Sequence, residues 1–401
     1  MNKINNIPLS LYIHTPWCVQ KCPYCDFNSH AIKNKIPEEQ YIKALINDFK
    51  NNLEFIQSRK IHSIFIGGGT PSLFSAKSYD YLFNNLQKHC SFESDIEITL
   101  EANPGSFEKD KFLSYKNIGI NRLSIGVQSF NPEHLTILGR IHNKNQAIEA
   151  IEHAIEINFP KINIDIMHGL PNQSVEQAIS DLNTALSFDI QHLSWYQLTI
   201  ENNTYFAKFP PKLPDEEILE NINLLGHDLL EKHNFDNYEV SAYAKKLSQD
   251  DNGINRSKHN LNYWQFGDYL GIGAGAHSKI TKRNIPEQNL DIIRFSKTRS
   301  PQKYLEKFSN LEKYNNINLL SHFNKINQEN KVLEFMLNAF RLTDGFDISL
   351  FESRTGTNET YIKKQLNKAI ELKLINIKND MIKPTILGQK YLNSLIEIFI
   401  L

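Results

Sequence analysis

Three of the four cysteines lie in one short segment near the start of the chain, at Cys18, Cys22 and Cys25. Thiolates grouped on one loop are metal ligands, and their number indicates the chemistry. A [4Fe–4S] cluster held by four cysteines is coordinatively closed and serves electron transfer, whereas three cysteines leave one iron open to a small molecule. The segment therefore predicts a [4Fe–4S] cluster with an open iron.

Two other uses of these cysteines fit their pattern less well. A zinc ion would take His14 or His30 as its fourth ligand, but structural zinc sites usually draw ligands from two separated pairs, and no second Cys-x2-Cys follows. A disulfide framework needs an even number of cysteines and a secreted protein. We therefore expect the cluster and keep zinc as the rival. Cys90, which ends an amphipathic segment, is expected to be an inert buried thiol.

Short apolar runs and longer helical stretches alternate from Leu9 to about Lys232. The runs are rich in β-branched and aromatic residues and predict six strands, at Leu9–His14, Ile61–Ile66, Ile96–Glu101, Arg122–Val127, Ile162–Met167 and Leu193–Ile200. Helical spacing predicts helices at Pro37–Ile56, Ala76–His89, Asn145–Asn158 and Ser174–Ser187. This alternation indicates a parallel sheet with right-handed crossovers. Six units predict an α/β fold of the partial (β/α)6 barrel type, with an open doubly wound sheet as the alternative.

Polar or glycine-rich residues follow the carboxyl end of each predicted strand. The first strand leads into the cysteine segment, the second into Gly67–Pro71 and the third into Glu101, while later strands carry Gln128 and Asp165. In parallel α/β barrels the chemistry collects at this end of the strands. Glycines let the backbone approach a ligand closely, and carboxylates accept hydrogen bonds from ribose hydroxyls or an ammonium group. The rim therefore predicts a cofactor pocket.

Length and charge limit the class of protein. The 401 residues suffice for a domain of about 250 residues and a smaller one, and we expect boundaries at 1–235, 236–326 and 327–401. A formal net charge of −1 argues against a nucleic-acid partner. No apolar run is long enough for a membrane helix, so we expect at most peripheral membrane contact. Reduced cysteines indicate the cytoplasm.

The segment 327–401 has the pattern of a smaller, mainly helical domain. Apolar residues at helical spacing predict helices at Lys331–Leu342, Ile348–Thr355, Glu359–Leu374 and Gly388–Phe399. A hairpin is expected between Ile375–Ile377 and Met381–Pro384. Helices followed by a hairpin are winged-helix-like, but basic and acidic residues are nearly balanced here. We therefore expect packing or a lid over the substrate rather than DNA binding.

The motifs of the chain resemble those of the radical-SAM coproporphyrinogen-III oxidase family, and most closely its heme chaperone branch. The matching motifs are Cys18-x3-Cys22-x2-Cys25, Gly67–Leu73, Glu101–Gly105, Arg122–Phe130 and Asp165–Pro171. The resemblance implies that the open iron takes S-adenosylmethionine (SAM). It further implies SAM contacts from Tyr12, Tyr24, Gly68, Gly69, Thr70, Glu101, Gln128, Arg140, Asp165, Thr199 and His277.

A second motif, His259-Asn-Leu-Asn-Tyr263-Trp264, matches the His-Asn-x-x-Tyr-Trp pattern of the heme chaperone branch. An imidazole can ligate heme iron, and Tyr263 and Trp264 can stack on the flat macrocycle. The resemblance thus implies His259 as a heme ligand, with His277 as the competing histidine.

The resemblance implies a heme chaperone on a radical-SAM scaffold that binds heme, the cluster and SAM and delivers heme to recipient hemoproteins, such as respiratory ones, as a monomer or a homodimer. The enzyme alternative is an oxygen-independent coproporphyrinogen-III oxidase, which decarboxylates its substrate oxidatively. That oxidase carries Gly-Cys after its third cluster cysteine, where this chain has Asp26-Phe27, and a longer segment ahead of the cluster loop. We therefore expect the chaperone without oxidase activity, leave SAM cleavage open, and keep a structural zinc-binding protein as the third alternative.

Overall fold

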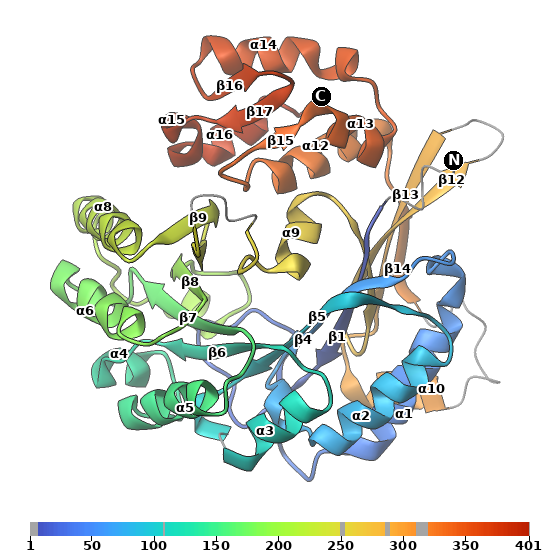
Figure 1. The fold of residues 1–401 in the computed structure, drawn as a ribbon, viewed down its shortest axis with the longest axis vertical. Helices are drawn as coiled ribbons and strands as arrows, with labels where there is room; N and C mark the ends of the chain where they lie inside the picture. Colours follow the sequence, from blue (N-terminus) through green and yellow to red (C-terminus); the bar gives the residue numbers. More distant parts are fainter. Residues whose placement is uncertain (1–6, 107–108, 249–252, 285–288, 310–319, 401) are drawn as a thin grey trace.

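One large mixed sheet forms the frame of the protein in the computed structural model (Figure 1). The structure describes residues 7–106, 109–248, 253–284, 289–309 and 320–400; the other residues of the predicted ranges 1–235, 236–326 and 327–401 lie outside the described part. The six predicted strands are confirmed and pair in parallel in chain order. They are β1 (Leu9–Thr15), β4 (Ile61–Gly68), β5 (Phe92–Ala102), β6 (Arg122–Gln128), β7 (Ile162–His168) and β8 (His192–Gln197).

Helices return the chain between these strands and lie along the outer side of the sheet (Figure 1). They are α1 (Glu38–Asn51), α2 (Ala76–Gln87), α3 (Lys109–Asn117), α4 (Pro132–Ile137), α5 (Lys144–Glu156), α6 (Val175–Leu186) and α8 (Glu216–Lys232). The start of α6 is fixed by a capping box, in which Ser174 and Gln177 each accept the other's backbone N–H. Crossover helices on one face distinguish a partial barrel from a doubly wound sheet, so the predicted barrel is confirmed.

Side chains alternate between the two faces of each strand. Leu9, Leu11 and Ile13 of β1 pack among the helices and are 0% exposed, and each such residue contributes about 1.5–3 kcal/mol relative to exposure. The other face of the sheet is polar. The residues that it presents to the inside of the barrel include Thr99, Glu101, Arg122, Ser124, Gln128, Asn163, Asp165, His192, Ser194 and Tyr196. The outer face therefore supplies stability, and the inner face carries groups for binding.

The segment 236–326 adds strands to both ends of this sheet, which the sequence did not predict. β9 (Phe235–Glu239) and β10 (Ala242–Lys245) continue it antiparallel beyond β8. β11 (Asp268–Ile272) runs parallel to β1, followed by antiparallel β12 (His277–Asn284), β13 (Asn289–Lys297) and β14 (Leu320–Lys325). The buried Asp268 carboxylate pairs with Arg59 Nη1 at 2.7 Å and Lys279 Nζ at 3.1 Å. Distant ion pairs thus fix β11 in place.

Helix α9 (Lys258–Trp264) lies at the amino ends of the strands on the inner side. His259 Nδ1 is 3.0 Å from Ser63 Oγ, and Asn262 Nδ2 donates to Ser10 Oγ at 2.8 Å. Because these serines lie near the first residues of β4 and β1, α9 closes the end of the barrel opposite the cysteine loop. Figure 1 shows α9 between the sheet and the C-terminal unit.

The C-terminal unit, orange to red in Figure 1, combines helices with a small sheet of order β15-β17-β16. Its elements are α12 (Gln328–Ala339), β15 (Phe346–Asp347), α13 (Ile348–Thr355), α14 (Lys363–Glu371), β16 (Ile375–Lys378), β17 (Met381–Pro384), α15 (Ile386–Lys390) and α16 (Leu392–Glu397). The predicted hairpin is confirmed, because Asn379 and Asp380 both take positive φ as a two-residue turn requires. The predicted last helix is divided at Tyr391. Among the described residues, no helix has both the length and the apolar character needed to cross a membrane.

Candidate cofactor-binding site

A cavity of about 520 Å³ extends inward from the carboxyl ends of the parallel strands. The three cysteines Cys18, Cys22 and Cys25 line it, together with nine of the residues predicted to contact SAM. These are Tyr24, Gly68, Gly69, Thr70, Glu101, Gln128, Arg140, Asp165 and Thr199. The barrel thus brings together residues that are spread over half of the sequence, as a single cofactor pocket requires.

The cysteines lie on the loop that follows β1, and all three are free thiols. The neighbouring glycine loop holds this segment, because the Gly69 N–H donates to the Thr15 carbonyl at 2.7 Å. Burial raises the pKa of the Cys18 and Cys25 thiols. Burial thus disfavours the free thiolates of these two cysteines, which a bound metal would stabilise.

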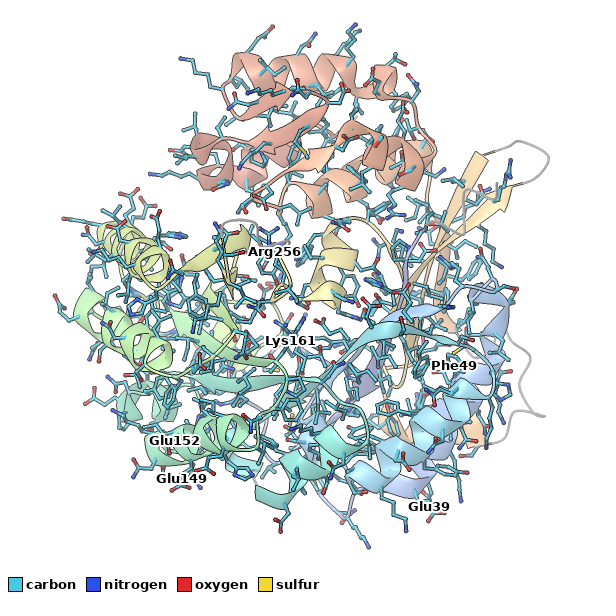
Figure 2. All side chains as sticks on the ribbon, viewed as in Figure 1. Glu39, Phe49, Glu149, Glu152, Lys161 and Arg256 are labelled. Atoms are coloured by element: carbon cyan, nitrogen blue, oxygen red, sulfur yellow. The ribbon has the colours of Figure 1, made fainter. Side chains whose placement is uncertain are left out.

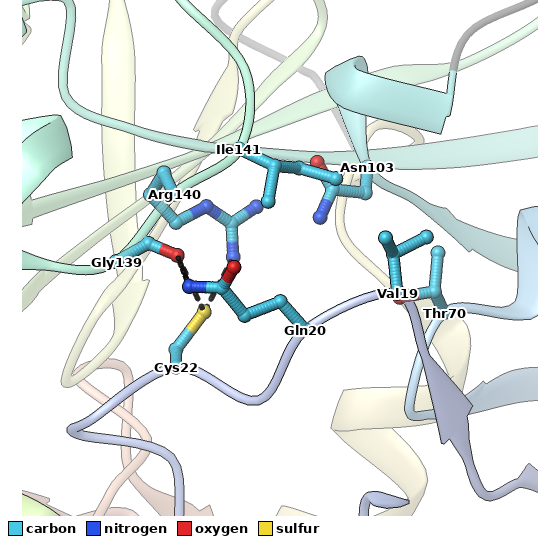
Figure 3. A pocket seen from close by; sticks show the side chains of 8 residues that line it. All are labelled: Val19, Gln20, Cys22, Thr70, Asn103, Gly139, Arg140 and Ile141. Atoms are coloured by element: carbon cyan, nitrogen blue, oxygen red, sulfur yellow. Dashed lines mark hydrogen bonds between the residues drawn. The ribbon is translucent and has the colours of Figure 1, made fainter. Parts of the chain in front are cut away.

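Arg140 lies against the same loop (Figure 3). Its Nη1 is 3.6 Å from Cys22 Sγ, and its Nη2 donates to the Gly126 carbonyl at 2.7 Å. The Gly139 carbonyl accepts from Gln20 Nε2 at 3.4 Å and faces Cys22 Sγ at 3.9 Å. These groups surround a smaller pocket of about 10 Å³ behind the loop. Arg140 thus places a positive charge beside a predicted cluster ligand.

The donor set fits a cluster better than a single zinc ion. His14, a suggested fourth zinc ligand, has both ring nitrogens engaged, with the Tyr12 hydroxyl at 2.9 Å and the Asn28 carbonyl at 3.0 Å. Three thiols facing one cavity suit a cluster, in which each thiolate binds a different iron.

Glu101 is buried at the end of β5. The Gly68 N–H donates to its Oε2 at 3.1 Å, and only glycine fits there, because Gly68 has a φ of +112° and a Cβ would lie 2.3 Å from the His14 ring. Burial, and then the nearby Asp165 carboxylate, raise the pKa of Glu101 from 4.5 to about 8, while the Gly68 hydrogen bond opposes them. A cationic ligand group in the cavity would stabilise the ionised carboxylate.

Asp165 is held by hydrogen bonds from neighbouring strands. Ser124 Oγ donates to its Oδ2 at 2.9 Å, and Asn163 Nδ2 donates to its Oδ1 at 2.8 Å. Burial raises the pKa of Asp165, and these hydrogen bonds oppose the rise. Two carboxyl groups with raised pKa values in one cleft mark it as a ligand site for hydroxyl or cationic groups.

Gln128 has a backbone conformation that is rare for a residue with a side chain, with a φ of +71°. Tyr196 donates its hydroxyl hydrogen to Gln128 Oε1 at 2.6 Å. Asp181 of α6 fixes the next turn, accepting from Ser129 Oγ at 2.5 Å and from the Phe130 N–H at 2.8 Å. Sequence reasoning did not single out Asp181, whose helix carries no motif. It positions Gln128 from behind the wall of the cavity.

Two residues predicted to contact SAM do not line the cavity. Tyr12 lies behind its wall, with its ring centroid 6.4 Å from that of Phe65. His277 begins β12 and is exposed, outside the lining residues. Thr199 lies at the mouth, where its hydroxyl donates to Glu201 at 3.0 Å.

The residues of the predicted heme motif lie at the other end of the barrel. His259 is 2% exposed and its Nε2 has no hydrogen-bond partner in the described structure. Its ring centroid is 5.1 Å from that of Phe65, which lines the cavity. Tyr263 packs on His259 and Tyr269, with ring centroids 5.0 and 4.4 Å apart. Trp264 packs against the guanidinium of Arg341, 4.4 Å from the centroid of its ring, so one of its faces is covered.

The fold and the three-cysteine cavity define a radical SAM protein. The model of the radical SAM superfamily matches residues 12–182, and the model of the HemN C-terminal domain matches residues 326–389. The fold matches the solved structure of coproporphyrinogen III oxidase (HemN) from Escherichia coli with a TM-score of 0.80. The match covers 100% of this chain and 91% of the oxidase chain. At 21% sequence identity, that likeness concerns the fold.

Closer relatives give the family. Proteins named heme chaperone HemW from Haemophilus influenzae and Escherichia coli are 48% and 44% identical to this chain, each over 98% of both chains. The chain belongs to the HemW family of radical SAM proteins.

Proposed function

We propose that this protein is a heme chaperone: it binds heme as cargo and delivers it to recipient hemoproteins in the cytoplasm. The observation that carries the proposal is the similarity over 98% of the chain to proteins named heme chaperone HemW. The polar cavity beneath the cysteine loop supports the radical-SAM part of this proposal, because it offers a cofactor site inside the barrel.

We assign the resident cofactors to the wall of this cavity. Cys18, Cys22 and Cys25 would hold a [4Fe–4S] cluster. Once bound to the protein, the cluster would offer SAM an iron that no cysteine ligates. Glu101 and Asp165 would hold the cationic and hydroxyl groups of SAM, and Gly68 keeps Glu101 in position through its N–H. Arg140 orients the loop that carries Cys22.

We propose His259 as the ligand of heme iron. Its Nδ1 is engaged by Ser63 Oγ, so its Nε2 is the nitrogen left for a metal, and a hydrogen bond at the other nitrogen is typical of ligating histidines. Burial lowers the pKa of His259 to about 3, so its imidazole is neutral at physiological pH, as ligation requires. Since the ring is buried, the α9 segment must move aside for the iron to reach it.

Equilibrium titration of the anaerobically reconstituted protein with heme tests this assignment. We expect wild type to bind heme stoichiometrically and His259→Ala to lose the ligand-field bands and at least tenfold in affinity. His277→Ala is the matched control, because it removes the competing, exposed histidine. An unchanged heme spectrum in His259→Ala together with a changed one in His277→Ala would move the ligand to His277.

The oxidase alternative is tested with the same preparation. Incubation of the reduced protein with SAM and coproporphyrinogen III should leave that substrate unchanged under the chaperone proposal. Formation of protoporphyrinogen IX would make the protein an enzyme instead.

A further inference from the structure

The inner part of the cavity carries a cationic group that is far from the cysteines. Arg122, the first residue of β6, is 2% exposed and lines the cavity. Its Nη1 donates to the Asn255 carbonyl at 3.3 Å, whereas its Nη2 has no hydrogen-bond partner within the described residues. A buried N–H that lacks an acceptor is costly in free energy. Glu97 Oε2, 3.7 Å from Arg122 Nη1, also has no hydrogen-bond partner among the described residues, so the Arg122 Nη2 is left for an acceptor that a ligand can supply.

A second donor without a partner lies beside it. Thr99 of β5 is the register partner of Arg122 across the sheet, on a strand about 4.8 Å away. Thr99 is 1% exposed and lines the same cavity, and its Oγ1 has no hydrogen-bond partner among the residues described. Two residues that line this cavity therefore each carry a buried donor without a partner in the described structure.

The local charge calls for an anion. Glu97 Oε2 is 3.7 Å from Arg122 Nη1 and 3.8 Å from the Nζ of Lys161, which is labelled in Figure 2. Within 4 Å, one carboxylate thus faces two cations, and a single additional negative charge balances these three groups. A planar carboxylate matches the guanidinium fork and carries that one charge, whereas a phosphate dianion exceeds it.

This donor pair is distinct from the cysteine rim. Arg122 and Gln128 mark the two ends of β6, which at about 3.3 Å per residue puts them about 20 Å apart. Around Arg122 the cavity is lined by Ser257 and Asn260. Asn260 belongs to α9, the helix that also carries His259.

We propose that Arg122 and Thr99 form a carboxylate-binding subsite at the inner end of the cavity, and that its occupant is a propionate of heme. The identity of the occupant rests on the proposed function, whereas the subsite rests on the two unpaired donors. Heme carries carboxylates only on its two propionates. A propionate held at Arg122 directs the macrocycle toward α9 and the proposed iron ligand His259.

Titrations of the cluster-loaded protein with heme and with heme dimethyl ester test the subsite. Wild type should bind heme about 10- to 100-fold more tightly than the ester, because the ester carries no negative charge to pair with the guanidinium. Thr99→Val keeps the side-chain shape and should weaken heme binding several-fold and ester binding less, because a hydrogen bond to a charged acceptor is stronger than one to a neutral acceptor. The double variant Arg122→Met/Glu97→Gln removes both charges of the ion pair, which avoids an unpaired buried carboxylate, and should abolish the preference.

Lys258→Met is the matched control, since it removes a neighbouring cation that pairs with Asp95 and lies outside the cavity lining. It should keep the preference for heme. Equal affinity of wild type for heme and its ester overturns the subsite and leaves heme binding intact. Binding of neither compound means that the proposed function fails. Sodium propionate then tests the subsite alone: it must protect wild type, but not the double variant, against thermal unfolding, and failure to do so overturns the subsite as well.

Discussion

Because folding raises the pKa of Glu101, a residue proposed to bind SAM, we expect this residue to lower the free energy of unfolding of the ligand-free protein as the pH rises. The pKa rises from 4.5 to about 8 on folding, so between these values the folded state binds more protons at Glu101 than the unfolded chain. The free energy of unfolding must then fall as pH rises, by up to 1.36 kcal/mol per pH unit. Between pH 6.0 and 8.5 the loss from this one group amounts to about 2.5 kcal/mol.

Glu101→Gln tests this sign and size. The amide cannot ionise but still accepts the Gly68 N–H, so the variant should gain about 2.5 kcal/mol relative to wild type on going from pH 6.0 to 8.5. Urea unfolding of the SAM-free protein at the two pH values gives the difference. Glu149→Gln, at the exposed residue labelled in Figure 2, makes the same charge change on α5 and should show no such trend.

Glu101→Gln should also bind SAM more weakly than wild type. Because a cationic group stabilises ionised Glu101, SAM binding at pH 7 should release close to one proton from wild type and none from Glu101→Gln. Calorimetry in two buffers of different ionisation enthalpy measures this number. A stability difference between variant and wild type that is the same at pH 6.0 and 8.5 would refute the reasoning.

Three other substitutions are informative. Cys22→Ala should lose the broad cluster absorbance near 400 nm after anaerobic reconstitution, whereas Cys90→Ala, a thiol outside the cavity, should retain it. Asp181→Asn weakens the anchor of the turn after Gln128 and should cost about 1–3 kcal/mol in stability and about tenfold in SAM affinity, measured by unfolding and by calorimetry; unchanged SAM affinity would refute its positioning role. Gly68→Ala should abolish SAM binding, because its Cβ would meet the His14 ring at 2.3 Å; a variant that binds SAM normally would contradict the requirement for glycine.

The barrel could be predicted because its strands carry their own signal. In β1 and its neighbours, β-branched and apolar residues alternate with polar ones, and the polar ones face inward. β11 carries no such signal, because Asp268 and Gly271 interrupt it and Arg59, far away in the sequence, fixes it. The local alternation of apolar and polar residues therefore predicts the central strands, but it does not predict strands such as β11 that long-range ion pairs hold in place.

The rim of the site was predictable for a similar reason, since each residue follows a strand end that periodicity locates. His277 shows the limit: its glycine-rich approach leads from β11 into β12 and leaves the histidine exposed. The same alternation along β6 that places Gln128 inward also places Arg122 inward. That Arg122 Nη2 has no hydrogen-bond partner among the described residues can be seen only in the three-dimensional structure.

The central claim is that this protein carries heme and hands it on. The most direct measurement is transfer from the heme-loaded, cluster-containing protein to an apo-hemoprotein, followed by the appearance of the recipient's own absorption bands and by the loss of heme from the donor. The account predicts stoichiometric transfer from wild type and none from a preparation of His259→Ala. Failure of wild type to bind or release heme, with conversion of coproporphyrinogen III in its place, would contradict it.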